Sequence, residues 1–115
     1  MMNTLTRGDF LEFKRVYSVF STVLETDSYL NEHRTKSTEK LKIFTMFHPL
    51  TSDVDIAEYG EDVKNMLYCI LYDIQPGALD YYDVITINDE DYEITSMKFF
   101  NTHARIDVKK KVEVI

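Results

Sequence analysis

The chain has few of the residues that form covalent or metal-bound cross-links. It has a single cysteine, Cys69, so it cannot form an internal disulfide. Its histidines, His33, His48 and His103, are far apart in the sequence, and with no second cysteine none shows a zinc-binding spacing. We therefore predict no metal site and no cofactor. Cys69 lies in the most apolar run of the chain, which indicates a small buried hydrophobe in a reducing compartment.

Long apolar runs and phosphate-binding loops are also missing. The longest apolar run, residues 65–72, is far short of the roughly 18 residues of a membrane helix, so we expect no membrane association. The first residues do not have the pattern of a secretory signal. There is no glycine-rich phosphate loop and no interdomain linker. At 115 residues and 44% hydrophobic content, the chain is predicted to be a single domain, residues 1–115.

No catalytic constellation emerges. Carboxylates are plentiful, but nothing in the sequence selects one pair for acid–base work. A nucleophilic role for Cys69 would need an accessible, electropositive setting, and its surroundings are apolar and acidic. The acidic run at residues 88–91 is too short for an EF-hand loop and is better interpreted as a hairpin turn. We expect that the protein is not an enzyme.

Charge is unevenly distributed. Residues 51–100 hold twelve acids and two bases, a net charge of −10, within a chain whose net charge is −7. Such a surface disfavours direct binding to a nucleic-acid backbone and favours basic protein partners or contacts between copies of the chain. The alternative is ordinary solubility charge.

The last third of the chain predicts two consecutive hairpins. Residues 84–87 and 92–97 alternate apolar and polar side chains around an acidic turn, and residues 103–108 follow a second reversal at 101–102. Alternation of this kind is typical of strands with one buried face.

The earlier part of the chain gives weaker signals. Residues 10–24 fit a helical stripe but are rich in β-formers, which favours a strand from Lys14 with a helical turn before it. Residues 30–40 are polar and predict either a solvated edge strand or an exposed loop. Residues 41–48 predict a second strand, stopped by Pro49.

The middle of the chain predicts a helical excursion, at about residues 51–62. Ser52 has the position of a helix cap, with Asp55 reaching back to it, and Gly60 suits the end of a helix that runs to about Tyr59. A long apolar strand, residues 63–72, and a turn at Pro76 follow. The fold class predicted is mainly β, a small antiparallel β-barrel or sandwich of five to seven strands at about residues 13–112, with one short helix in a central excursion.

Two further groups of residues are candidate contacts. Lys109, Lys110 and Lys111 form a basic run that would either contact an acidic neighbour or protect an edge strand from aggregation. Tyr81 and Tyr82 would either anchor an interface or cover the core. With the excursion, the candidate partner interface comprises Asp53, Asp55, Glu58, Tyr59, Glu61, Tyr81, Tyr82, Lys109, Lys110 and Lys111.

The order of these elements resembles a known family. A strand and polar hairpin lead to Phe47-His48-Pro49-Leu50, a short helix ends at Tyr59-Gly60, and an apolar strand leads to the closing unit. That unit is Asp83-Val84-Ile85-Thr86-Ile87 followed by Tyr92-Glu93-Ile94. Over residues 13–112 the chain resembles the head–tail joining proteins of long-tailed bacteriophages, also called head-closure or stopper proteins.

The resemblance implies a structural role in the virion. Such a protein would form a homo-oligomeric ring in the phage neck, between the portal or adaptor proteins and the tail-terminator or tail-tube proteins. The ring would close the DNA-filled head and dock the tail, with DNA present only in transit, and would be assembled in the bacterial host cytoplasm. The acidic excursion would then contact neighbours or narrow the channel, where negative charge repels DNA phosphates.

The same charge supports a rival function. A small acidic, phage-encoded inhibitor could mimic DNA and bind a basic nucleic-acid enzyme. A hydrolase on a β scaffold and a ligand-binding barrel are further alternatives. The richness in tyrosine and phenylalanine is more typical of core packing than of a ligand cavity.

Overall fold

The computed structural model describes residues 14–111, and seven strands in this range form one antiparallel sheet. The mainly β, antiparallel fold class is confirmed, and the strand number agrees with the prediction. The sheet order is β2-β1-β5-β6-β7-β4-β3. The strands are β1 (Arg15–Thr26), β2 (Glu32–Thr45), β3 (Phe47–Pro49), β4 (Met66–Tyr72), β5 (Val84–Ile87), β6 (Glu90–Phe99) and β7 (His103–Lys110).

The sheet curls until its two edge strands are consecutive in the chain. β2 and β3 are separated only by Met46, yet β2 pairs with β1 at one edge and β3 pairs with β4 at the other. The Thr45 hydroxyl donates to the Ile70 carbonyl of β4 at 3.0 Å, across the remaining gap. No ladder joins β2 to β3 within residues 14–111, so the sheet is not a closed barrel, and no second sheet makes it a sandwich.

The core lies inside this curl, on the side that the strands share. Successive side chains of a strand point to opposite faces, so every second residue enters the core. In β7, Ala104, Ile106 and Val108 are fully buried in the core cluster, while Arg105 and Lys109 point to the other face. Cys69 is also fully buried in the cluster, as predicted, and burial raises the pKa of its thiol to about 12.

The element predictions for the N-terminal half are mostly confirmed. Residues 15–26 form a strand, and the expected helical turn before Lys14 falls outside the described residues. Residues 32–40 are an exposed part of β2 rather than a loop. Pro49 does not stop β2, which ends at Thr45; it is instead the last residue of β3 and pairs with Leu67.

The C-terminal hairpins are confirmed in position. β5 and β6 are joined by a two-residue turn at Asn88 and Asp89, whose φ angles of 50° and 64° match the turn type that suits a twisted hairpin. The predicted turn at Pro76 is also present.

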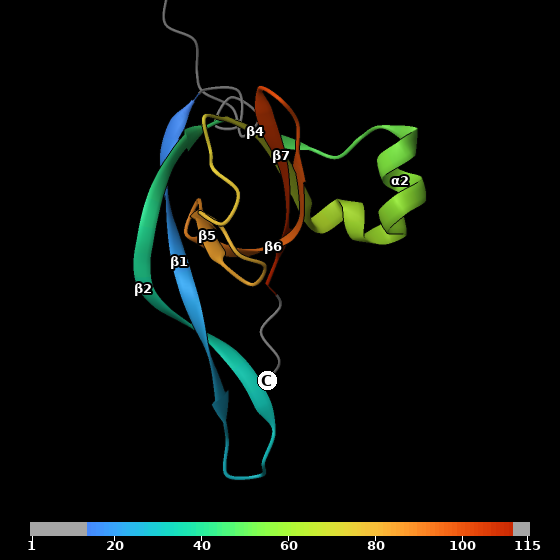
Figure 1. Cartoon of the computed structure of the whole chain (residues 1–115). Coiled ribbons are helices and arrows are strands. Elements are labelled where there is room, and N and C mark those ends of the chain that lie inside the picture. Colours follow the sequence, from blue (N-terminus) through green and yellow to red (C-terminus); the bar gives the residue numbers. More distant parts are fainter. Residues whose placement is uncertain (1–13, 112–115) are drawn as a thin grey trace, which may run out of the picture.

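The excursion between β3 and β4 contains two helices. α2 (Asp53–Tyr59) has the predicted bounds, and the 3-10 helix η1 (Gly60–Asn65) follows it directly. The predicted strand at residues 63–72 is therefore wrong for residues 63–65, where the helical path continues, and β4 begins only at Met66. Figure 1 shows both helices outside the curled sheet, beside β4 and β7. No helix formed by residues 14–111 has the length and apolar character to cross a membrane.

Candidate functional site

The excursion begins and ends where its sequence indicates. The Ser52 hydroxyl accepts a hydrogen bond from the backbone N–H of Asp55 at 3.1 Å, which satisfies one of the free donors of the first turn. Gly60 has a φ of 60°, a conformation that residues with a Cβ rarely adopt, and there the chain passes from α2 into η1. The Asp55 side chain was predicted to reach back to the helix cap, but its carboxylate instead accepts a hydrogen bond from Arg105 of β7.

A polar network fixes the excursion on the outer face of β7. Arg105 donates to Asp107 at 2.8 Å through Nε and to Asp55 of α2 at 2.9 Å through Nη2. The Tyr59 hydroxyl donates to the other oxygen of Asp107 at 2.6 Å, and the Arg105 guanidinium lies 4.3 Å from the centre of the Tyr68 ring in β4. Three charged groups and a phenol are thus paired at the junction, so the excursion has one defined position.

Burial makes this network sensitive to change. Asp107 is 1% exposed although it faces outward from the sheet, because the excursion covers it. Burial raises the pKa of the Tyr59 hydroxyl, and its hydrogen bond to the Asp107 carboxylate raises it further. Removing one partner of a buried charge pair typically costs about 3–5 kcal/mol, because the other charge is left without compensation.

Two more ion pairs tie the excursion to the sheet at its periphery. Glu58 lies 3.4 Å from Lys98 of β6, and Asp62 lies 3.2 Å from Lys109 of β7. These pairs are exposed, and exposed pairs contribute about 0–1 kcal/mol each. They contribute less to stability than the Arg105 network, but they neutralise the carboxylates of Glu58 and Asp62, which are then less available to a partner protein.

The residues proposed for a partner interface on the excursion therefore separate into two groups. Asp55 and Tyr59 are turned into the protein's own network, and Glu58 is paired with Lys98. Asp53 and Glu61 are exposed and form no ion pair with another described residue. Beside them Val54 is 74% exposed and Ile56 is also exposed, so the outer surface of the excursion is both acidic and apolar.

The acidic middle of the chain is largely neutralised in the fold. Of its twelve acids, seven form ion pairs within the chain: Asp55, Glu58, Asp62, Asp80, Asp83, Glu90 and Asp91. The buried Asp83 is the most enclosed of these outside the network, and it shares Lys40 with Asp80 at 2.8 Å each. Lys40 of β2 thus fixes the loop before β5.

The three lysines do not protect an edge strand. Lys109 and Lys110 belong to β7, which lies between β6 and β4 in the interior of the sheet, and Lys111 follows it directly. Lys109 meets Asp62 of its own excursion, and Lys110 lies 3.0 Å from Glu90. Two of the lysines thus meet acids of their own chain.

Tyr81 and Tyr82 are about half exposed, so neither closes the core. Tyr82 has a φ of 76°, which is unusual for a bulky residue, and the Arg34 guanidinium lies 4.3 Å from the centre of its ring. The Thr22 hydroxyl donates to the Tyr82 carbonyl at 3.0 Å. Tyr82 therefore supports the β1–β2 hairpin where it leaves the body.

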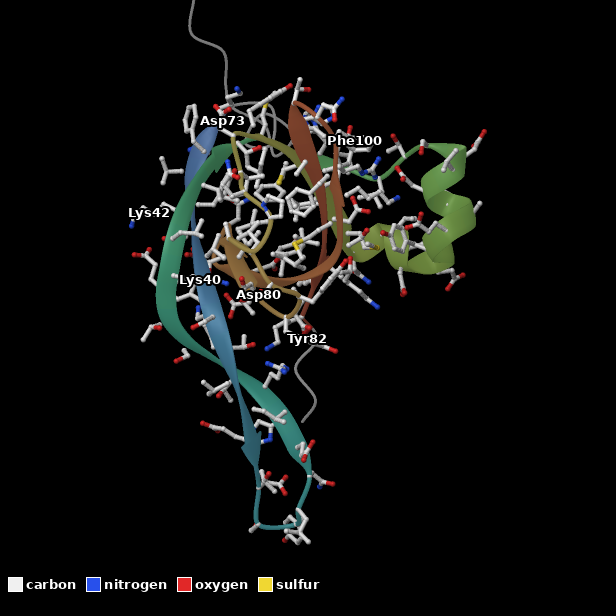
Figure 2. All side chains as sticks on the ribbon, in the orientation of Figure 1. Lys40, Lys42, Asp73, Asp80, Tyr82 and Phe100 are labelled. Carbon is white, nitrogen blue, oxygen red and sulfur yellow. The ribbon has the colours of Figure 1, made fainter. Side chains whose placement is uncertain are left out.

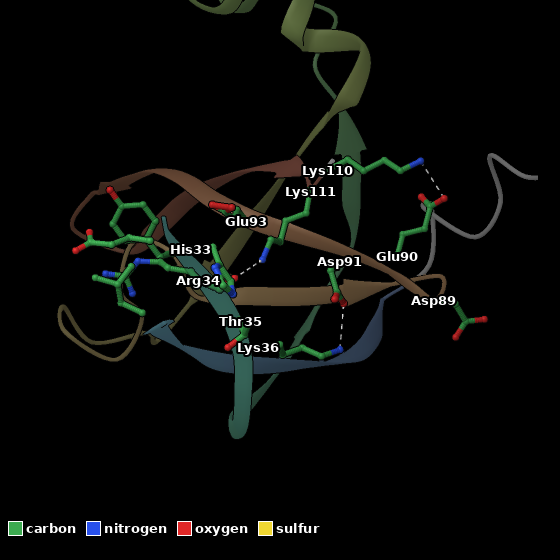
Figure 3. A pocket seen from close by; sticks show the side chains of 13 residues that line it. His33, Arg34, Thr35, Lys36, Asp89, Glu90, Asp91, Glu93, Lys110 and Lys111 are labelled. Atoms are coloured by element: carbon green, nitrogen blue, oxygen red, sulfur yellow. Dashed lines mark hydrogen bonds and ion pairs between the residues drawn. The ribbon is translucent and has the colours of Figure 1, made fainter. Parts of the chain in front are cut away.

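An open groove of about 1320 Å³ lies between that hairpin and the β5–β6 hairpin. Figure 3 shows that its walls carry charges of both signs, many of which meet each other. Lys36 lies 3.2 Å from Asp91, and the Lys111 ammonium donates to the Arg34 carbonyl at 3.4 Å. The groove is thus held together by its own ion pairs and presents no cluster of one charge to a ligand.

The β1–β2 hairpin projects beyond the body, as Figure 1 shows, and no sequence pattern indicates this projection. We call residues 23–33 the arm. At its tip, Asp27 accepts hydrogen bonds from the backbone N–H groups of Tyr29 and Asn31 at 2.8 and 2.9 Å. The tip is therefore an ordered turn, yet Tyr29 is 84% and Leu30 83% exposed.

The three histidines, which are the remaining candidate metal ligands, lie in separate parts of the fold. His33 lies in β2, His48 stacks against Tyr68, and His103 lies between Tyr72 and Phe100. Within residues 14–111 no group of three histidine, cysteine or acidic side chains has the geometry to hold a metal ion.

The partners of the network were the residues that sequence reasoning missed. Arg105 and Asp107 alternate with core residues in β7, as ordinary solvent-facing side chains do. No pattern in the sequence indicates that a segment some 50 residues earlier covers them.

No protein-family model matches this chain, and no characterised protein or solved structure is significantly similar to it.

Proposed function

We propose that this chain is a structural subunit of a bacteriophage neck. It forms a ring between the portal complex and the tail, closes the DNA-filled head and docks the tail. Its partners are copies of itself, portal or adaptor proteins above the ring, and tail-terminator or tail-tube proteins below it. The order of elements that resembles head–tail joining proteins is the sequence basis of the proposal.

The observation that carries the proposal is the pairing of a rigid body with two projecting elements. The arm leaves one end of the curled sheet, and the helical excursion leaves its side. The excursion is held by the buried network of Arg105 and Asp107, and the arm ends in a turn ordered by Asp27. Elements that are ordered before binding lose little entropy on assembly, which suits a subunit that meets several neighbours at once.

The exposed acids of the excursion suit a surface beside passing DNA. Asp53 and Glu61 are exposed and form no ion pair with another described residue. Their negative charge therefore repels DNA phosphates. Asp55, by contrast, serves the fold, so it is not a candidate for the channel or for a neighbour.

The rival function, inhibition by mimicry of DNA, has weaker support. A mimic must present a row of free carboxylates to a basic enzyme, whereas most acids of residues 51–100 are paired within the chain. Binding of the isolated chain to a basic nuclease, with inhibition, would favour the rival.

The neck proposal is tested first by the genes beside this one and then by removing the gene. Portal, capsid and tail genes are expected as neighbours. Without the protein, electron microscopy of lysates should show separate heads and tails, with heads that fail to retain DNA. Normal tailed particles would refute the proposal.

A paired-variant experiment tests the outer surface of the excursion. Asp53→Asn combined with Glu61→Gln should reduce the yield of joined particles when it replaces the wild-type protein. Asp89→Asn combined with Glu93→Gln removes the same charge at the β5–β6 hairpin and should leave the yield unchanged. Equal yields from both pairs would exclude the excursion as a contact surface.

A further inference from the structure

An exposed aromatic surface lies at the end of the body opposite the arm. Its members are linked by contacts: Val16 pairs with Phe44 across β1 and β2, and the Lys14 ammonium lies 5.9 Å from the ring centres of both Phe44 and Tyr72. The Tyr72 ring lies 6.0 Å from that of His103, which stacks on Phe100 at 4.9 Å. We call this surface the aromatic rim: Lys14, Val16, Phe44, Tyr72, Phe100 and His103.

The rim is mostly apolar, and no segment of residues 14–111 covers it. Val16, Phe44, Tyr72 and Phe100 are each more than half exposed, on outer faces that the sheet leaves uncovered. Contiguous exposed aromatic side chains of this kind are typical of protein–protein contact sites, where large rings supply most of the binding free energy.

The tip of the arm complements the rim in charge and in the apolar character of its exposed side chains. Its two most exposed side chains are Tyr29 and Leu30, on a narrow two-stranded ribbon. Residues 25–32 hold three acids, Glu25, Asp27 and Glu32, and no base. Lys14, at the centre of the rim, has no carboxylate partner among the described residues. The tip therefore offers carboxylates to the Lys14 ammonium and an aromatic side chain to the rings beside it.

We infer that the arm tip of one copy binds the aromatic rim of a second copy. Figure 2 shows Phe100 at the upper end of the body and the arm at the lower end, and the longest dimension of the molecule is 56 Å. The two surfaces of one copy therefore cannot meet each other. Two antiparallel copies can make this contact reciprocally, and in any other arrangement it continues from copy to copy as a ring or a fibre.

This inference deepens the proposed function, because it names the surfaces through which copies of the ring subunit meet. It does not require the neck itself. The tip is small, so the contact is weak in the isolated chain and is strengthened when several copies are held together.

Disulfide trapping in the full chain tests the contact. Leu30→Cys and Phe100→Cys are made as separate variants, mixed at high concentration and oxidised. Cys69 stays silent because it is buried and its thiol pKa is about 12. A cross-linked pair of the two variants is expected to form at least tenfold faster than the pair of Leu30→Cys with Val54→Cys, although Val54 on the excursion is more exposed than Phe100.

A charge exchange gives a second readout. Lys14→Glu in the Phe100→Cys partner should slow the trapping, and Glu25→Lys in the Leu30→Cys partner should restore it. Trapping no faster than the control pair overturns the inference. So does a ready internal cross-link between Phe10→Cys and Phe100→Cys within one chain, since the chain's own N-terminal residues would then cover the rim.

The two proposals fail separately. Trapping that succeeds while phage particles form normally without the protein would leave the contact and refute the neck role. Trapping that fails while heads and tails stay separate without the protein would leave the neck role and refute the contact.

Discussion

At the scale of the residue, Asp107 decides where the excursion lies. It is a buried carboxylate on a strand face that would otherwise be solvated, and it receives hydrogen bonds from Arg105 of its own strand and from Tyr59 of α2. A buried charge is tolerated only when its partners compensate for lost hydration. Asp107 therefore makes one position of the excursion far more favourable than any position that leaves it uncovered.

Tyr59 gives this junction a pH dependence. Its pKa is raised above the ordinary value of 10.0, first by burial and then by the hydrogen bond to Asp107. The folded protein thus holds the phenol proton more tightly than the unfolded chain. The corresponding stability is fully present below about pH 10 and is lost as the pH rises through the folded value.

We expect Tyr59→Phe to remove this pH dependence. At pH 7 the variant should be less stable by about 1.5–3 kcal/mol, because a hydrogen bond to the buried Asp107 carboxylate is lost. Above pH 10 its free energy of unfolding should fall less steeply than that of the wild type, as measured by urea denaturation at several pH values. The exposed Tyr81→Phe should follow the wild type, and parallel curves for all three proteins would contradict the assignment.

At the scale of the element, the arm is two strands closed by a side chain. The strands follow from β-forming residues in 15–26, but the closure depends on Asp27, which accepts two backbone hydrogen bonds and places Leu30 at a φ of 64°. The polar residues 25–29 favour a turn here, because side chains of this kind bond to their own backbone. For residues 30–40 the sequence left open both a solvated edge strand and an exposed loop, because residues 32–40 bury almost nothing. Pairing with β1 makes residues 32–40 a strand.

Asp27→Ala should loosen the tip without affecting the body. Hydrogen exchange of the amides of Tyr29 and Asn31, followed by NMR, is expected to accelerate by roughly fivefold. Asp27→Asn retains an acceptor oxygen and should stay close to the wild type. The hydrogen bonds from Asn31 and Tyr29 lower the pKa of the Asp27 carboxyl below its ordinary value of 3.8. The carboxylate therefore stays charged, and the wild-type tip should stay ordered, down to a pH below 3.8. Unchanged exchange in Asp27→Ala would show that the side chain does not hold the turn.

At the scale of the whole molecule, the body and the arm are separate in their energetics. Every residue of the core cluster lies outside residues 23–33, and the base of the arm is attached through Thr22, Arg34 and Lys36. The arm thus adds length and contact surface, whereas stability comes from the apolar residues inside the curled sheet.

Replacing residues 25–33 with an Asn-Gly turn should leave the body intact. This turn suits a two-residue hairpin between Leu24 and Arg34, which already face each other. The midpoint of thermal unfolding is expected to shift by no more than about 3 °C. Ile85→Ala, in the core, should by contrast cost about 2–5 kcal/mol. Loss of cooperative unfolding on removal of the arm would show that the arm is part of the core structure.

The sequence by itself determined the strands of the C-terminal hairpins, the helix bounds from Ser52 to Gly60 and the burial of Cys69. These depend on local signals, alternation, caps and apolar runs, which act between neighbours in the chain. Only the tertiary structure decided that the sheet stays open between β2 and β3, that Lys109 lies in an interior strand, and that Asp55 and Tyr59 serve the protein's own fold. The reason is physical. A charged residue in a sequence is expected to face solvent, and Arg105 and Asp107 meet their partners Asp55 and Tyr59, about 50 residues away, only through tertiary packing.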